Sequence, residues 1–140
     1  MNIRFSVLEL LAVRDFAGEL MRSELYEKNF SVEVAVHNIE VQLLGVGCIE
    51  FPNGRWVCLR GDERRVIKLH VSRADTPWIH WLSDAGARLI SARGGEDWRY
   101  QYLVSVEEKV RTKLLERGAI ETGNGWEFTN AEEEADAVEL

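Results

Sequence analysis

Three residues of the sequence have side chains that could form a disulfide or bind a metal ion. Cys48 and Cys58 lie on the two arms of a predicted hairpin, and alternation along the next strand places His70 on the same face of the sheet. The Cys-x-x-Cys and His-x-x-x-His spacings typical of zinc sites are missing, and a cross-strand disulfide requires oxidising conditions. We therefore expect two free thiols, no metal site and no cofactor.

Catalytic chemistry has no local signature. A nucleophile needs an adjacent base, and the sequence contains neither a Gly-x-Ser-x-Gly turn nor a comparable motif. The three histidines, His37, His70 and His80, fall on separate predicted elements. The segment Gly45-Val46-Gly47 lacks the third glycine of a dinucleotide-binding loop. The chain is expected to be noncatalytic, although its 24 carboxylates leave an acid–base pair open.

Tryptophan is frequent, with five copies in 140 residues, and this residue is favoured both in cores and at the centres of protein interfaces. Trp56 is predicted to lie on the hairpin face opposite the core, and Trp81 at the edge of the buried stripe of its helix. We expect these two residues to anchor a protein partner, or a second copy of the chain. A predicted basic rim beside them comprises Arg60, Arg64, Arg65 and Lys68.

A second candidate partner is duplex DNA. Residues 105–129 resemble the last part of a winged-helix DNA-binding domain, through Leu114, Leu115, Gly118, Ile120, Trp126, Phe128 and Thr129. The resemblance implies a groove- and phosphate-contacting set formed by Lys109, Arg111, Thr112 and Lys113, with the hairpin tip near Asn124 at the DNA backbone. Acidic residues dilute the positive charge of this helix, so protein binding is the preferred prediction.

The net charge of −7 belongs largely to the C-terminal end. Residues 131–140 carry five acidic side chains and no basic one. Removing these five from the 24 acidic residues leaves 19 against 17 basic residues, a net charge of −2 for the rest. Such a near-neutral body lacks the general basic excess of a nonspecific nucleic-acid binder. We expect one domain over residues 1–130 and an acidic tail over 131–140.

The expected fold class is α+β. A capping box formed by Ser6 and Glu9 predicts a helix over 7–27, although a strand over the first dozen residues is an alternative. Alternating valines predict a strand from Ser31, and the turn 51–55 predicts a hairpin. With a strand over 66–71, these segments form an antiparallel meander of three to four strands packed with two to three helices. The predicted core face of the hairpin comprises Ile49, Phe51, Val57 and Leu59.

The second half of the chain predicts a helix, a strand, a further helix and a small hairpin. Thr76 as N-cap and Pro77 at the first helical position predict the start of the first helix, and Gly94-Gly95 its end. Alternation predicts a strand over 98–104, while the spacing of Tyr102, Val106, Val110 and Leu114 equally suits a longer helix. A capping box of Ser105 and Glu108 would open a helix ending at Arg117, followed by a hairpin over 119–129. The buried side of the first helix should carry Trp78, Leu82, Gly86 and Leu89.

The function expected from these features is noncatalytic binding to a protein partner. No stretch approaches the roughly 18 apolar residues of a membrane span, so no membrane partner is expected and the chain is placed in the cytoplasm. A small domain with an acidic tail and no catalytic signature has the profile of an intracellular inhibitor, immunity or phage-accessory protein that blocks a macromolecular partner. This class assignment is an expectation by analogy.

Overall fold

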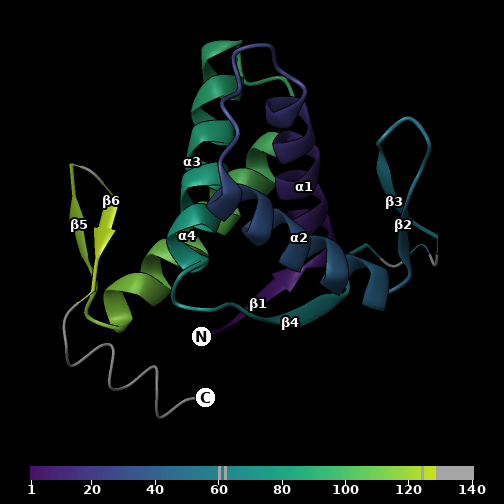
Figure 1. The fold of residues 1–140 in the computed structure, drawn as a ribbon. Coiled ribbons are helices and arrows are strands. Elements are labelled where there is room, and N and C mark those ends of the chain that lie inside the picture. The colour runs from purple at the N-terminus through teal and green to yellow at the C-terminus, as the bar shows by residue number, and fades with distance from the viewer. Residues whose placement is uncertain (60, 62, 124, 129–140) are drawn as a thin grey trace.

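The chain has an α+β fold in which three short strand pairs lie around a group of packed helices (Figure 1). The computed structural model describes residues 1–59, 61, 63–123 and 125–128, so the predicted acidic tail lies outside the described residues. The elements are β1 (Asn2–Ser6), α1 (Val7–Met21), α2 (Phe30–Gly45), β2 (Cys48–Glu50), β3 (Trp56–Cys58), β4 (Val66–His70), α3 (Thr76–Ala92), α4 (Arg99–Glu116), β5 (Ile120–Thr122) and β6 (Gly125–Glu127).

Helices α1, α3 and α4 form the main core. Helix α3 packs along α4, α1 packs against both, and α2 crosses α1 and α3 (Figure 1). Phe16 of α1, Leu82 of α3 and Leu103 of α4 are buried at this junction. No helix in the described part of the chain has both the length and the apolarity that a membrane crossing requires.

Residues 30–45 form a helix, so the strand predicted from Ser31 is wrong. Helix α2 follows Asn29, whose side-chain oxygen accepts a hydrogen bond from the Val32 backbone N–H at 3.2 Å. The alternating valines suit a strand, but a larger apolar set repeats at helical spacing and buries one face of the helix. That set comprises Val32, Ala35, Val36, Ile39 and Leu43.

The strands pair in three separate two-stranded antiparallel sheets, and the predicted meander over 31–71 does not form. Strand β4 pairs with β1, in a register that runs from Asn2 opposite His70 to Ser6 opposite Val66. Helix α1 follows β1 directly and ends at Met21, earlier than the predicted residue 27. The capping box is confirmed, because the Glu9 N–H donates to the Ser6 hydroxyl and the Ser6 N–H donates to the Glu9 carboxylate.

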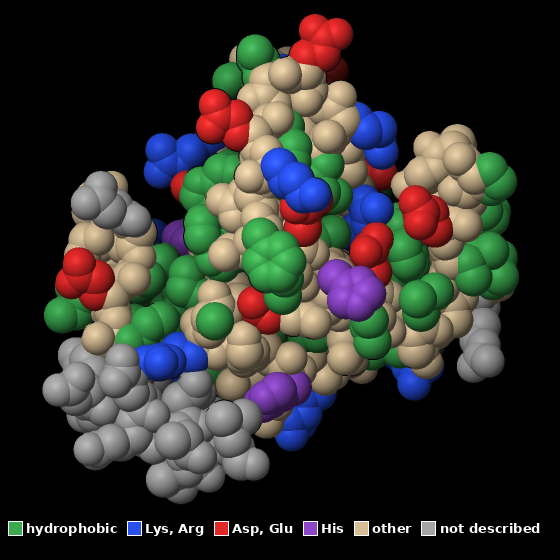
Figure 2. All heavy atoms as spheres, in the orientation of Figure 1, with side chains coloured by type: hydrophobic (Ala, Val, Ile, Leu, Met, Phe, Trp, Pro, Cys, Tyr) green, Lys and Arg blue, Asp and Glu red, His purple; other side chains and the backbone are tan. Residues whose placement is uncertain are grey.

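Hairpin β2–β3 has the predicted register, with Cys48 opposite Cys58 and Ile49 opposite Val57. The Phe51 N–H donates to the Arg55 carbonyl at 2.8 Å, and Gly54 adopts the expected positive φ of 85°. The predicted core face is wrong, because Leu59 is 64% exposed whereas Trp56 is 8% exposed. The hairpin packs its Cys48 and Trp56 side against α1 and α2, and apolar side chains line its outer side (Figure 2).

Helix α3 has nearly the predicted bounds. Thr76 is its first helical residue and Asp75 its N-cap, so the predicted N-cap at Thr76 is wrong by one residue. At the other end, the Gly95 N–H donates to the Ile90 carbonyl at 2.8 Å. Leu82 and Gly86 are buried as expected and Trp78 is partly buried, whereas Leu89 is 38% exposed, so its predicted burial is wrong. The buried face of α3 is rotated slightly from the predicted one. Its other buried apolar residues are therefore Ile79 and Ile90.

Residues 99–116 form one continuous helix, α4, so the strand predicted over 98–104 is wrong and the alternative of a longer helix is confirmed. Ser105 lies inside this helix, and its hydroxyl donates to Glu9 of α1 at 2.7 Å. The capping box predicted for Ser105 and Glu108 is therefore wrong. The C-terminal hairpin β5–β6 forms as predicted, on the opposite side of the molecule from β2–β3 (Figure 1).

Candidate functional site: an aromatic pocket beside a buried histidine

A pocket of about 450 Å³ lies between the first half of α3 and hairpin β5–β6. Trp78 and Trp81 line it from α3, and Trp126 lines it from β6. The Trp78 and Trp81 rings meet edge to face, with centroids 6.3 Å apart. Trp81 is 45% exposed, which confirms the expected partial exposure. The volume falls within the range of about 300–1,000 Å³ that is typical of ligand pockets.

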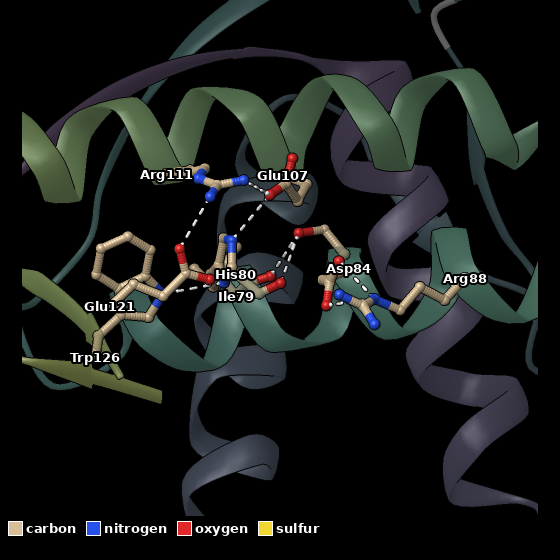
Figure 3. A network of polar contacts seen from close by, with 9 residues as sticks. Ile79, His80, Asp84, Arg88, Glu107, Arg111, Glu121 and Trp126 are labelled. Atoms are coloured by element: carbon tan, nitrogen blue, oxygen red, sulfur yellow. Dashed lines mark hydrogen bonds and ion pairs between the residues drawn. The ribbon is translucent and has the colours of Figure 1, made fainter. Parts of the chain in front are cut away.

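Two carboxylates stand at the rim of this pocket. Asp84 follows Trp81 on α3, and Glu121 lies on β5. Arg88 approaches Asp84 with an N···O distance of 3.1 Å, which confirms the predicted i,i+4 ion pair. Arg111 of α4 donates to Glu121 at 3.0 Å (Figure 3). The Arg88 side chain is 80% exposed, so its pair with Asp84 contributes little to stability.

His80 lies at the inner side of the pocket and both of its ring nitrogens are engaged (Figure 3). The Trp126 indole N–H donates to His80 Nδ1 at 3.1 Å. Because an indole nitrogen only donates, Nδ1 is the acceptor and Nε2 carries the ring hydrogen. This N–H donates to Glu107 Oε1 at 3.1 Å. The two hydrogen bonds thus fix one tautomer of His80. In this tautomer His80 links hairpin β5–β6 to α4.

The polar groups beside the pocket are hydrogen-bonded within the chain. With both nitrogens bonded, His80 is not placed to take a proton from a substrate. The nearby Ser83 hydroxyl donates to the carbonyl oxygens of Ile79 and His80 at 3.0 Å, within its own helix. What faces the solvent is a set of indole rings next to carboxylates. Such a surface suits a ligand that carries positive charge.

The structure separates the two predicted anchor residues. Trp81 lies in the aromatic pocket, whereas Trp56 is buried under hairpin β2–β3 and lines another cavity. Arg64, Arg65 and Lys68 are exposed near and on β4, and none of them lines the pocket of Trp81. Arg60 lies outside the described residues.

Two of the residues predicted to contact DNA bind carboxylates of the chain itself. Lys109 donates to Glu9 at 2.7 Å, and Arg111 is bonded to Glu121. Thr112 and Lys113 line a shallow depression beside β1, while Asn124 lies outside the described residues.

The sequence prediction missed Trp78, His80, Glu121 and Trp126 as members of one site. The spacing of Trp78 and Trp81 places them on neighbouring parts of one helix, which is a signal visible in the sequence. The sequence gives no comparable signal that Trp126 of β6 lines this pocket, because its position depends on how hairpin β5–β6 packs against α3.

The two cysteines are free thiols that face each other across β2–β3. Burial, followed by the hydrogen bond with Cys58, raises the pKa of the Cys48 thiol to about 12. His70 lies on β4, and the structure forms no metal-binding group of three His, Cys, Asp or Glu residues within its described part. Cys48 therefore has the character of an unreactive core thiol.

Comparison with known proteins yields no match to a family model, a curated protein or a solved structure.

Proposed function

We propose that the chain is a noncatalytic protein-binding domain that receives an arginine side chain of its partner in the aromatic pocket. The observation that carries this proposal is the set of three tryptophans beside Asp84 and Glu121, with both nitrogens of His80 engaged. A guanidinium group stacks on indole faces and pairs with carboxylates through its planar donors. The pocket offers both kinds of partner.

The chain's own arginines support this choice of ligand. Arg88 and Arg111 already bring guanidinium groups to the two rim carboxylates. The Arg88 pair is highly exposed, so an incoming guanidinium can replace it at low cost. Arg88 thus acts as a competitor of the ligand, and its removal should strengthen binding.

The direct test uses N-acetyl-arginine amide as the probe and the uncharged isostere N-acetyl-citrulline amide as the control. We expect the arginine probe to shift the indole N–H resonances of Trp81 and Trp78 in NMR spectra, and citrulline to shift them far less. Trp81→Ala should weaken binding about tenfold, the size of one good cation–π contact. Arg88→Gln should strengthen it. Equal binding of the two probes would refute the charge argument.

Partner capture tests the wider proposal. A tagged chain should retain a protein partner from lysate after nuclease treatment, and Trp81→Ala should lose it. Trp98→Ala is the matched control, because Trp98 is also exposed but lies at the start of α4, outside this pocket. Capture that disappears with nuclease, together with salt-dependent binding to duplex DNA, would instead support the winged-helix alternative. The narrower proposal of a cytoplasmic inhibitor or immunity protein further requires that capture lower the partner's activity.

A further inference from the structure

The outer side of the β1–β4 sheet carries uncompensated positive charge. The two strands lie side by side below the helices (Figure 1), and their register places Arg4 directly opposite Lys68. Both side chains are exposed, and like charges in opposite positions of a sheet repel each other. Within the described part of the chain, no ion pair joins Arg4 or Lys68 to a carboxylate. An acidic group outside the described residues would relieve this repulsion.

A depression of about 460 Å³ between β1 and α4 continues this surface, and Arg4 and Lys113 line it. The other charged residues of the depression are Lys109, Glu108 and Glu116. Lys109 is already compensated by Glu9 at 2.7 Å. Both glutamates of the depression lie on α4, so the excess of positive charge is on the side of the strands. Arg4, Lys68 and Lys113 are called the basic face below.

The last described residue lies near the basic face. The Arg73 guanidinium lies over the ring of Phe128, 5.3 Å from the ring centroid. Arg73 follows β4 and is five residues beyond Lys68, so the two are at most about 17 Å apart. The segment that continues from Phe128, residues 129–140, therefore starts within reach of Arg4 and Lys68.

This segment has the charge that the basic face lacks. Residues 131–140 carry five acidic side chains and no basic one. Three of the acidic residues, Glu132, Glu133 and Glu134, are four to six positions beyond Phe128, which an extended chain spans in about 13–20 Å. That length matches the separation of Arg73 and Lys68.

We propose that residues 131–140 bind to the basic face of the same molecule, through ion pairs of the three consecutive glutamates with Arg4 and Lys68. A single exposed ion pair contributes little, but a tethered segment meets the face at a high effective concentration and forms several pairs at once. The proposal does not depend on the aromatic pocket. Lys113 belongs both to the basic face and to the residues predicted to contact DNA, so the bound segment would compete with nucleic acid there.

The test is cross-linking of the full chain with a carbodiimide, which joins a lysine amine directly to a carboxylate in contact with it. Peptide mass spectrometry of the monomer fraction should find Lys68 linked to residues 131–140. Lys28 is the internal reference, because it is exposed on the connection between α1 and α2. We expect the Lys68 link to exceed the Lys28 link at least about tenfold, since the tether favours one site. In 1 M NaCl the Lys68 link should fall to the level of Lys28, because salt screens exposed charges.

Two matched pairs of variants make the test specific. Arg4→Gln should lower the Lys68 link about threefold, the size of one exposed ion pair, whereas Arg88→Gln on α3 should leave it unchanged. In NMR spectra, joint replacement of three tail glutamates by glutamine should shift the backbone amide resonances of β1 and β4. The control replaces three exposed glutamates elsewhere and removes the same charge, but should leave these resonances in place. The tail set is Glu132, Glu133 and Glu134, and the control set is Glu24, Glu27 and Glu96.

The proposal is overturned if residues 131–140 are linked to Lys28 as often as to Lys68. It is also overturned if the Lys68 link occurs only in covalent dimers, because the basic face would then bind the segment of a second copy. Amide resonances of β1 and β4 that respond equally to the tail variant and to its control would contradict it as well.

Discussion

Glu9 is a single carboxylate that serves two helices. It caps α1 by accepting from the Ser6 N–H at 2.8 Å, and it binds α4 through Lys109 and the Ser105 hydroxyl, both at 2.7 Å. Burial alone would raise the pKa of Glu9, but the hydrogen bonds from Lys109, Ser6 and Ser105 outweigh burial and lower that pKa below its ordinary value of 4.5. The ionised form of Glu9 therefore stabilises the folded state.

This pKa shift makes the contribution of Glu9 depend on acidity. Glu9→Gln should lower the free energy of unfolding at pH 7 by about 1–3 kcal/mol, the usual cost of breaking a buried charge-assisted hydrogen bond. The stabilisation is present above the ordinary pKa of 4.5 and is lost as pH falls through the lower folded value. Urea denaturation should thus show a gap between variant and wild type that narrows below pH 4.5. Glu108→Gln, at an exposed position of α4, is the control. A gap of constant size would contradict this role.

Cys48 should be protected from alkylation in the native protein. A thiol with a pKa of about 12 is almost wholly protonated at pH 8, and the side chain is fully buried. Iodoacetamide should therefore modify Cys48 in the native protein only as fast as the hairpin opens, and rapidly in urea. Peptide mass spectrometry gives both rates. Rapid native labelling of Cys48 would show that β2–β3 is not packed on α1 and α2 as described.

The contact of α1, α3 and α4 depends on Gly86. A Cβ atom at this position would lie 2.9 Å from Leu103 Cδ1 and 3.0 Å from the Phe16 ring. Gly86→Ala should therefore destabilise the fold by about 1–3 kcal/mol through overpacking, despite the better helix propensity of alanine. Gly45→Ala is the matched control, because nothing lies within 4 Å of its Cβ position at the end of α2. Thermal unfolding should show opposite signs for the two variants, and equal shifts would contradict the close packing at Gly86.

Elements whose signals are local could be predicted from the sequence, and those decided by packing could not. The turn 51–55 and the ends of α3 depend on proline, asparagine and glycine at fixed places, and they formed within one residue of their predicted positions. The apolar residues of segment 31–36 fit both the two-residue period of a strand and the spacing of a helix. The helix forms because its apolar face packs against α1 and α3. The burial of Trp56 likewise depends on which side of the hairpin faces α1.

The candidate site was predictable only in part for the same reason. The exposed position of Trp81 follows from its place on the helix, and the structure confirms it. The approach of Trp126 and Glu121 joins segments about 40 residues apart, and no periodic pattern records such a contact. At Ser105 the sequence instead predicted a feature that does not form. The capping motif occurs there by chance inside a helix, and the Ser105 hydroxyl donates to Glu9.

Hairpin β5–β6 is joined to the helices through Trp126 and Glu121. The Trp126 bond to His80 and the Arg111 bond to Glu121 attach it to α3 and α4. Trp126→Phe keeps the ring but removes the donor, so hydrogen exchange in residues 119–128 should become faster while the exchange in α3 and α4 stays nearly unchanged. Trp98→Phe is the control. Faster exchange throughout the chain would show that the hairpin is part of the cooperative core.

The pairing of β1 with β4 also determines the order in which the chain can fold during synthesis. Strand β1 leaves the ribosome before its partner, which begins at Val66, about 60 residues later. At about 5–20 residues per second, the nascent strand waits several seconds with Ile3 and Phe5 uncovered. Helices α3 and α4, in contrast, are neighbours in the sequence and can pack as soon as both have emerged. The pairing of β1 with β4 therefore forms only after residues 66–70 have been synthesised.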